Sequence, residues 1–191
     1  MRLFIIMTAC ALLAACQHDI PEPPPAITFA AAPYALNVGS INVIEDYVSP
    51  RHAPNAEQLF DMPPDKAMKD WATSRLVAAG KAGTLEVDII NASVIRKNIP
   101  KQKTGLEGLL TKEQTEEYDG TLEVTLKIYD DVAILPVAHA HVSAHQTLTL
   151  REDATLLERK ALYRQLTANL MQAIDSELNK NIRQYFSHYL M

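Results

Sequence analysis

The sequence has little cysteine, and both of its cysteines, Cys10 and Cys16, lie close to the N-terminus. Without a cysteine after residue 16, the rest of the chain has no disulfide, no zinc–thiolate site and no cysteine nucleophile. Hydrophobic runs long enough to cross a bilayer are missing as well. The run over residues 3–13 has eleven residues, whereas a transmembrane helix needs about 20.

Positive charge is also scarce. The chain has 18 Lys and Arg against 23 Asp and Glu, which gives a formal net charge of −5. Loss of residues 1–15 would remove only Arg2 among the charged residues and make the net charge −6. Because nucleic-acid binding needs clustered Lys and Arg, we expect no nucleic-acid partner.

Enzyme motifs are absent. There is no Gly-x-Ser-x-Gly turn, no phosphate-binding loop, no His-Glu-x-x-His and no dinucleotide-binding glycine pattern. Ser93, Ser143 and Ser176 lie in regularly patterned segments, and Glu116 and Glu117 belong to what we expect to be a short, solvated helix. We therefore expect no enzyme and no catalytic residue.

The N-terminus has the pattern of an export signal. Met1 and Arg2 precede the apolar run, which has the length of a signal-peptide core. The stretch Leu13-Ala14-Ala15-Cys16 resembles the bacterial lipobox. This resemblance implies that residues 1–15 are a lipoprotein signal peptide and that Cys16 carries a diacylglycerol and an N-acyl chain, the only cofactor-like group we expect. The alternative is an ordinary secretory signal cut after Ala15, with Cys16 a plain thiol.

A proline-rich segment follows, and we expect residues 16–34 to be a tether. It contains Pro21, Pro23, Pro24, Pro25 and Pro33, and such a segment favours extended polyproline II. In the alternative, Ile27 and Phe29 belong to a strand on the domain.

Residue 17 bears on the choice of membrane. In bacterial lipoproteins an aspartate directly after the acylated cysteine commonly causes retention in the inner membrane. Gln17 stands there instead, so we expect the outer membrane rather than the inner.

Residues 35–191 have the length of one domain, and their patterns predict four strands and two helices. Strands are expected over residues 36–48 with a bend at Gly39, from Leu85 with a bulge after Ile89, over residues 121–128 and over residues 137–150. One helix is expected from Pro63-Pro64 to Gly80, with Trp71 in the core, after a loop that buries Phe60.

The C-terminal helix is the longest expected element. Thr155 and Glu158 have the spacing of a capping box, and its apolar face is Tyr163, Leu166, Leu170, Ile174, Leu178, Ile182 and Tyr185. A shorter helix is expected over residues 112–118, from Thr111 and Gln114. The fold class is α+β: a two-layer domain with a mostly antiparallel four-stranded sheet, two main helices on one face and the order β-α-β-β-β-α.

Two groups of residues are candidate binding sites. His139 and His141 share the non-core face of a strand at a spacing of about 6.6 Å, from which two imidazoles can reach one zinc ion, but His145 is too far along to join them. We interpret this face as solvated or partner-facing. A basic hairpin loop over residues 96–108 is a candidate contact for anionic lipid or an acidic partner, through Arg96, Lys97, Lys101 and Lys103.

The lipobox, the proline-rich tether and this order of elements, which ends in a long helix, resemble the ABC-type transport auxiliary lipoproteins and, more distantly, the lipopolysaccharide-assembly lipoprotein. Residues 54–60, 71–76 and 152–156 also resemble uncharacterised lipoproteins of alphaproteobacterial type. The resemblance implies a non-catalytic, membrane-anchored envelope lipoprotein that faces the periplasm and docks on another envelope protein as an accessory to lipid or solute transport. The alternatives are a periplasmic carrier of lipid or a small ligand, and a metal-dependent hydrolase that uses the strand histidines.

Overall fold

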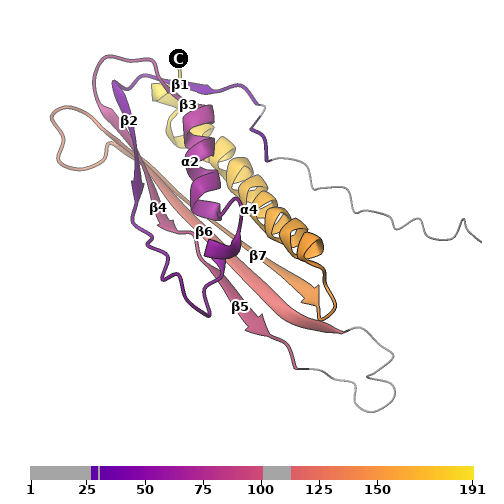
Figure 1. Ribbon diagram of the computed structural model, residues 1–191. Helices are drawn as coiled ribbons and strands as arrows, with labels where there is room; N and C mark the ends of the chain where they lie inside the picture. Colours follow the sequence, from indigo (N-terminus) through magenta and orange to yellow (C-terminus); the bar gives the residue numbers. More distant parts are fainter. Residues whose placement is uncertain (1–26, 30, 101–112) are drawn as a thin grey trace, which may run out of the picture.

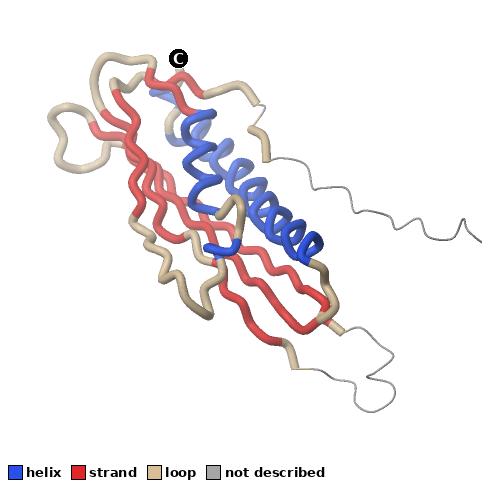
Figure 2. The backbone as a smooth tube through the Cα atoms, in the orientation of Figure 1, coloured by secondary structure: helices blue, strands red, loops and turns tan. Residues whose placement is uncertain are grey.

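The computed structural model describes residues 27–29, 31–100 and 113–191, which form a sheet layer and a helix layer (Figure 1). The helices lie on one side of the sheet, as Figure 2 shows. The helices are α2 (Pro64–Arg75) and α4 (Leu156–Tyr185), with short 3-10 turns η2 (Glu57–Leu59) and η3 (Ser187–Tyr189). The strands are β1 (Tyr34–Leu36), β2 (Ser40–Glu45), β3 (Leu76–Ala78), β4 (Thr84–Asn91), β5 (Val94–Asn98), β6 (Gln114–Tyr129) and β7 (Ala138–Arg151).

The main sheet is built around β6. Strands β4 and β5 follow each other along one side of β6, and β7 runs antiparallel along its other side. Strand β2 lies outside β4 and parallel to it. The α+β class, the mostly antiparallel sheet and the long C-terminal helix are confirmed, but the main sheet has five strands rather than four. The described elements follow the order β-β-α-β-β-β-β-β-α rather than β-α-β-β-β-α.

The expected strand from Leu85 is divided in two. The register of β4 against β6 shifts between Ile89 and Asn91, and the chain then resumes as β5 from Val94. The predicted bulge is therefore confirmed. The prediction of a hairpin loop over residues 96–108 is wrong at its start. Arg96 and Lys97 belong to β5, where they pair with Tyr118 and Glu117 of β6. Lys101 and Lys103 lie outside the described residues.

The prediction of a short helix over residues 112–118 is wrong for the described residues, because residues 114–118 belong to β6. Tyr118 is fully buried, and its ring packs edge-on against Tyr163 of α4 at 5.2 Å. Strand pairing on both sides of β6, together with this burial, outweighs a local capping signal. The acidic residues Glu116 and Glu117 consequently lie on a strand and not on a helix.

Helix α4 packs on β6 and β7 through the periodic face predicted for it. Thr155 and Glu158 form the expected capping box, and six of the seven predicted face residues are buried: Tyr163, Leu166, Leu170, Ile174, Leu178 and Ile182. The prediction fails at Tyr185, which is 51% exposed, because Phe186 enters the core instead.

Small residues on the sheet let α4 come close. A Cβ atom at Gly120 of β6 would lie only 3.0 Å from a methyl of Leu170. Strand β7 turns Ala140, Val142 and Ala144 inward, as its alternation predicts. The core face of the sheet is thus filled by direct contact with the helix.

Helix α2 begins after Pro63, as predicted, but it ends at Arg75 rather than at Gly80. Leu76 leaves the helix because residues 76–78 form β3, which pairs in parallel with β1. Arg75 is buried at the helix end, where it lies 3.4 Å from Asp175 of α4 and over the ring of Tyr34. This contact joins α2, α4 and β1.

The N-terminal end of the described chain packs more tightly than a tether would. Ile27 and Phe29 are partly buried against the core, though not in a strand, and Tyr34, assigned to the tether, is buried in β1. The C-terminal end closes the same region, since Leu190 bridges to Leu36. Phe60, which was expected to plug the core from a loop, is buried and stacks on Tyr163 with ring centroids 4.3 Å apart.

Trp71 offers a test of this packing. It is fully buried on α2, and its indole Nε1 donates to Asp175 at 2.6 Å. Replacing Trp71 with Ala leaves a cavity and removes one of the two partners of Asp175, whose carboxylate keeps only Arg75. We therefore expect the free energy of unfolding to fall by about 3–5 kcal/mol, measured by denaturant unfolding. Val132→Ala, at a side chain that is 91% exposed, is the control and should change it by less than about 0.5 kcal/mol. Equal losses in the two variants would contradict the packing.

Candidate interaction surface

The outer side of β7 is a free sheet edge within the part of the chain that the structure describes. All of the strand's ladder partners belong to β6 on its inner side. Helix α4 covers the core face of β7, but among the described residues it forms no backbone hydrogen bond with β7. On the outer side of an edge strand, every second residue has an unpaired N–H and C=O group.

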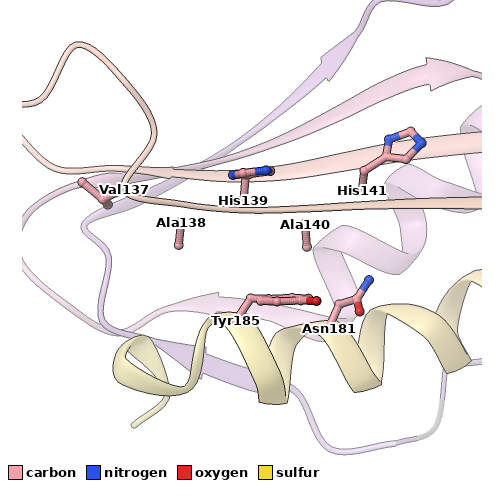
Figure 3. Close-up of a pocket in the computed structure, with 7 residues that line it drawn as sticks. All are labelled: Val137, Ala138, His139, Ala140, His141, Asn181 and Tyr185. Atoms are coloured by element: carbon pink, nitrogen blue, oxygen red, sulfur yellow. The ribbon is translucent and has the colours of Figure 1, made fainter.

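A shallow pocket of about 590 Å³ lies beside this edge, between the start of β7 and the last turns of α4. Figure 3 shows Ala138 and Ala140 directed toward the helix, and Asn181 and Tyr185 reaching back from it. His139 and His141 point to the opposite side of the strand. The recess exists because two neighbouring inward positions carry only methyl groups.

The loop between β6 and β7 exposes large apolar side chains. Val132, Ile134 and Leu135 are 91%, 94% and 76% exposed. Asp130 holds the loop by accepting hydrogen bonds from the backbone N–H groups of residues 132 and 133, and Asp131 accepts one from Gly83 at 2.9 Å. We call residues 132–135 the apolar loop. Apolar side chains clustered this way commonly mark a contact site.

Two of the histidines on the solvent-exposed face of β7 have separate partners. His141 Nδ1 lies 3.0 Å from the Thr125 hydroxyl, and His145 contacts Asp119. No group of three or more metal-ligating side chains is found among the described residues. The arrangement brings His139 and His141 to one face, as predicted, without a third ligand beside them.

The basic candidate residues are divided between the described and undescribed parts of the chain. Lys97 binds Asp119 at 2.8 Å and Glu117 at 3.4 Å across the sheet. The hydrogen bond from Lys97 lowers the pKa of Asp119, with His145 adding to the effect. Lys97 is therefore engaged within the domain. Cys16, the expected lipidation site, also lies outside the described residues.

Glu57 is a buried acid that sequence reasoning missed. One carboxylate oxygen accepts hydrogen bonds from Tyr47 at 2.6 Å, Ser49 at 2.7 Å and Asn55 at 3.2 Å. The other accepts from the backbone N–H groups of Ala56 and Val94. These bonds attach the segment before α2 to the start of β5.

The same bonds decide the ionisation of Glu57. Burial alone would raise its pKa, but the hydrogen bonds from Tyr47, Ser49 and the Val94 N–H outweigh burial and lower it. Glu57 also lines a shallow cleft of about 370 Å³. The ionised carboxylate, hydrogen-bonded at both oxygens, holds the segment before α2 against the start of β5.

Glu116 is engaged in a similar way. Burial would raise its pKa, but hydrogen bonds from Arg159 and Tyr118 outweigh burial and lower it. Glu57 and Glu116 are thus both held by hydrogen bonds within the domain.

The three serines named above lie on different elements: Ser143 is exposed on β7, Ser176 is on α4, and Ser93 is in the turn between β4 and β5.

The fold and these surfaces describe a two-layer α+β domain with a free edge and an exposed apolar loop. No family model and no curated protein sequence matches the chain. Among solved structures, it is similar to a minor lipoprotein from Acinetobacter baumannii, with 15% identity and a TM-score of 0.40 over 76% of this chain and 94% of that one.

Two further structures are similar at lower scores. Uncharacterised lipoprotein B from Nitrosomonas europaea has 10% identity and a TM-score of 0.36 over 78% of this chain and 88% of that one. A protein from Xanthomonas campestris has 11% identity and a TM-score of 0.32 over 82% of this chain and 96% of that one. Likeness at this level carries no information about what this chain binds.

The apolar loop had a visible signal in the sequence. The run from Val132 to Val137 is mostly apolar although it follows the Asp130-Asp131 turn, and apolar residues in a turn are unusual. The bonding of Glu57 had none, because its partners come from three separate segments.

Glu57 gives a pH-dependent prediction. Its pKa is lower in the folded chain than its ordinary value of 4.5, so its contribution to stability is present above that value and is lost as pH falls through the folded pKa. Glu57→Gln should cost about 1–3 kcal/mol at neutral pH, and the difference from the wild type should shrink as the solution is acidified. Urea unfolding across pH measures it. A difference that stays constant with pH would contradict this account; Glu177→Gln, half exposed on α4, is the control.

Proposed function

We propose that this chain is a non-catalytic lipoprotein of the bacterial envelope that docks on another envelope protein, as an accessory subunit of a lipid or solute transport assembly. Three features support the proposal: the lipobox at Cys16, the engagement of the buried acids in packing, and the exposed apolar loop. The loop is the observation that carries it.

The physical cost of the apolar loop favours a partner. Three large aliphatic side chains stay in water, and burying each one would stabilise a complex by about 1.5–3 kcal/mol. The hydrogen bonds that Asp130 and Asp131 accept from backbone N–H groups already hold the loop in place, so little further ordering is needed on binding.

The charge beside the loop favours a protein over a membrane. Asp130 and Asp131 are exposed at its base, and anionic lipid headgroups would repel them. An apolar groove with a basic rim would match both the aliphatic tip and the two carboxylates. We therefore expect the partner to present such a groove.

The carrier alternative needs a cavity between the helices and the sheet. Helix α4 contacts β6 closely at Gly120, and the pocket between α4 and the start of β7 is a shallow recess rather than an enclosed cavity. No helix in the described part of the chain is long and apolar enough to cross a bilayer. Attachment through Cys16 and retention in the outer membrane, favoured by Gln17, belong to the proposal.

Site-specific crosslinking tests the docking. A photo-crosslinking residue at position 135 of the full chain, in intact envelopes, should give one discrete protein adduct, because the Leu135 side chain enters the partner groove. Adding Ile134→Asp should abolish the adduct without lowering the amount of folded chain, since Ile134 is 94% exposed.

The matched control places the same crosslinker at Val43, which is 38% exposed on β2. Adducts of equal yield at positions 43 and 135, or adducts to lipid alone at position 135, would contradict docking through the apolar loop.

A further inference from the structure

The edge of β7 lacks the features that usually keep sheet edges apart. Residues 138–150 contain no Lys, Arg, Asp, Glu, Pro or Gly. The one register irregularity between β6 and β7 lies at the far end, between Gln114 and Glu116 of β6, so β7 is unbroken over this length. Natural edge strands are normally protected by charges, prolines, bulges or shortness.

The opposite edge of the same sheet is protected. Strand β2 ends at Glu45, which binds Lys69 at 2.6 Å. Strand β5 carries Arg96 and Lys97, and its Ile95 is already bridged by Asn55 from the preceding loop. The contrast makes β7 the open edge among the described strands.

The chemistry of β7 suits a second copy of itself. Two identical strands that pair antiparallel place like residues near one another, so any charge they carried would repel its mate. Residues 138–150 contain no Lys, Arg, Asp or Glu, and any charge on His145 lies against Asp119 of its own chain. A strand without charged side chains avoids this repulsion, as a strand that pairs with its own copy requires.

The shape of the edge is also complementary to itself. The start of β7 is small, with Ala138 and Ala140 beside the pocket, whereas its end carries Leu148, which is only partly buried. A two-fold axis at Ser143 would place Leu148 of one copy beside Ala138 of the other. The leucine would then enter the recess formed by the alanines and Tyr185.

We propose that β7 pairs antiparallel with β7 of a second copy about a two-fold axis near Ser143, which joins the two sheets into one. The apolar loops then lie at opposite ends of the joined sheet and remain free. This surface is separate from the docking surface, so either can fail without the other.

A cysteine scan of the full chain in intact envelopes tests the pairing. The chain has two cysteines, Cys10 and Cys16. In the proposed lipoprotein, Cys10 is lost with the signal peptide and Cys16 carries lipid, so each introduced cysteine is the free thiol that can form a disulfide. Facing residues of paired antiparallel strands have Cα atoms about 4.5–5.5 Å apart, within the range that a disulfide spans. Single variants at His139, His141, Ser143, His145 and Thr147 are exposed to a mild oxidant.

The expected result is a disulfide-linked homodimer that peaks at Ser143→Cys and falls on both sides, because one position lies nearest to its own mate. Asn42→Cys, exposed on the opposite edge at β2, should give no such band. A flat profile, a yield equal to that of Asn42→Cys, or a linkage to a different protein would overturn the proposal.

Charge variants give a second measurement on the purified full chain. His141→Glu with His145→Glu, and His141→Lys with His145→Lys, should each be monomeric by native mass spectrometry, because position 141 faces position 145 of the mate. A mixture of the two variants should give a dimer with one copy of each. Homodimers that persist in both variants, or a mixture that stays monomeric, would overturn the proposal.

Discussion

The packing of α4 on β6 and β7 is the constraint on which the rest of the structure depends. Seven apolar side chains of α4 are buried, and Gly120 and the alanines of β7 bring the helix close. Because the helix layer covers one face of the sheet, contacts with other molecules are left to the sheet edge, the wet face and the loops. The same small residues that admit α4 also form the recess beside Tyr185.

Elements whose signal is local could be predicted from the sequence, and those decided by distant contacts could not. The capping box at Thr155, the alternation of β6 beyond Gly120, the burial of Trp71 and the bulge after Ile89 all follow from residues close in the chain. Residues 114–118 become strand because β5 and β7 pair on either side of them. Helix α2 ends at Arg75 because residues 76–78 pair with β1, more than 30 residues earlier. The hydrogen bond from the Val94 N–H to Glu57 also joins residues that are distant in the chain.

In the proposed function, the surfaces of this chain serve contact rather than chemistry. The buried carboxylate of Glu57 is fully hydrogen-bonded and Glu116 binds Arg159 and Tyr118, so each stabilises packing. The apolar loop exposes aliphatic side chains on a backbone that hydrogen bonds to Asp130 and Asp131 fix in place. The outer edge of β7 has unpaired backbone groups and no Lys, Arg, Asp or Glu side chain over residues 138–150. A lipid anchor at Cys16 would complement such surfaces, because holding a domain at a membrane raises the effective concentration of partners there. The described residues begin at Ile27, so the ten residues between it and the anchor span at most about 36 Å.

The fate of a Cys16→Ala variant tests the central claim, that this is a tethered docking domain, most directly. Fractionation and thermal unfolding of this variant, beside the wild-type chain, should show a folded domain with an unchanged midpoint that has left the membrane fraction and lost its crosslink at position 135. A variant that stays in the membrane fraction, or that keeps the full crosslink after release, would contradict the account.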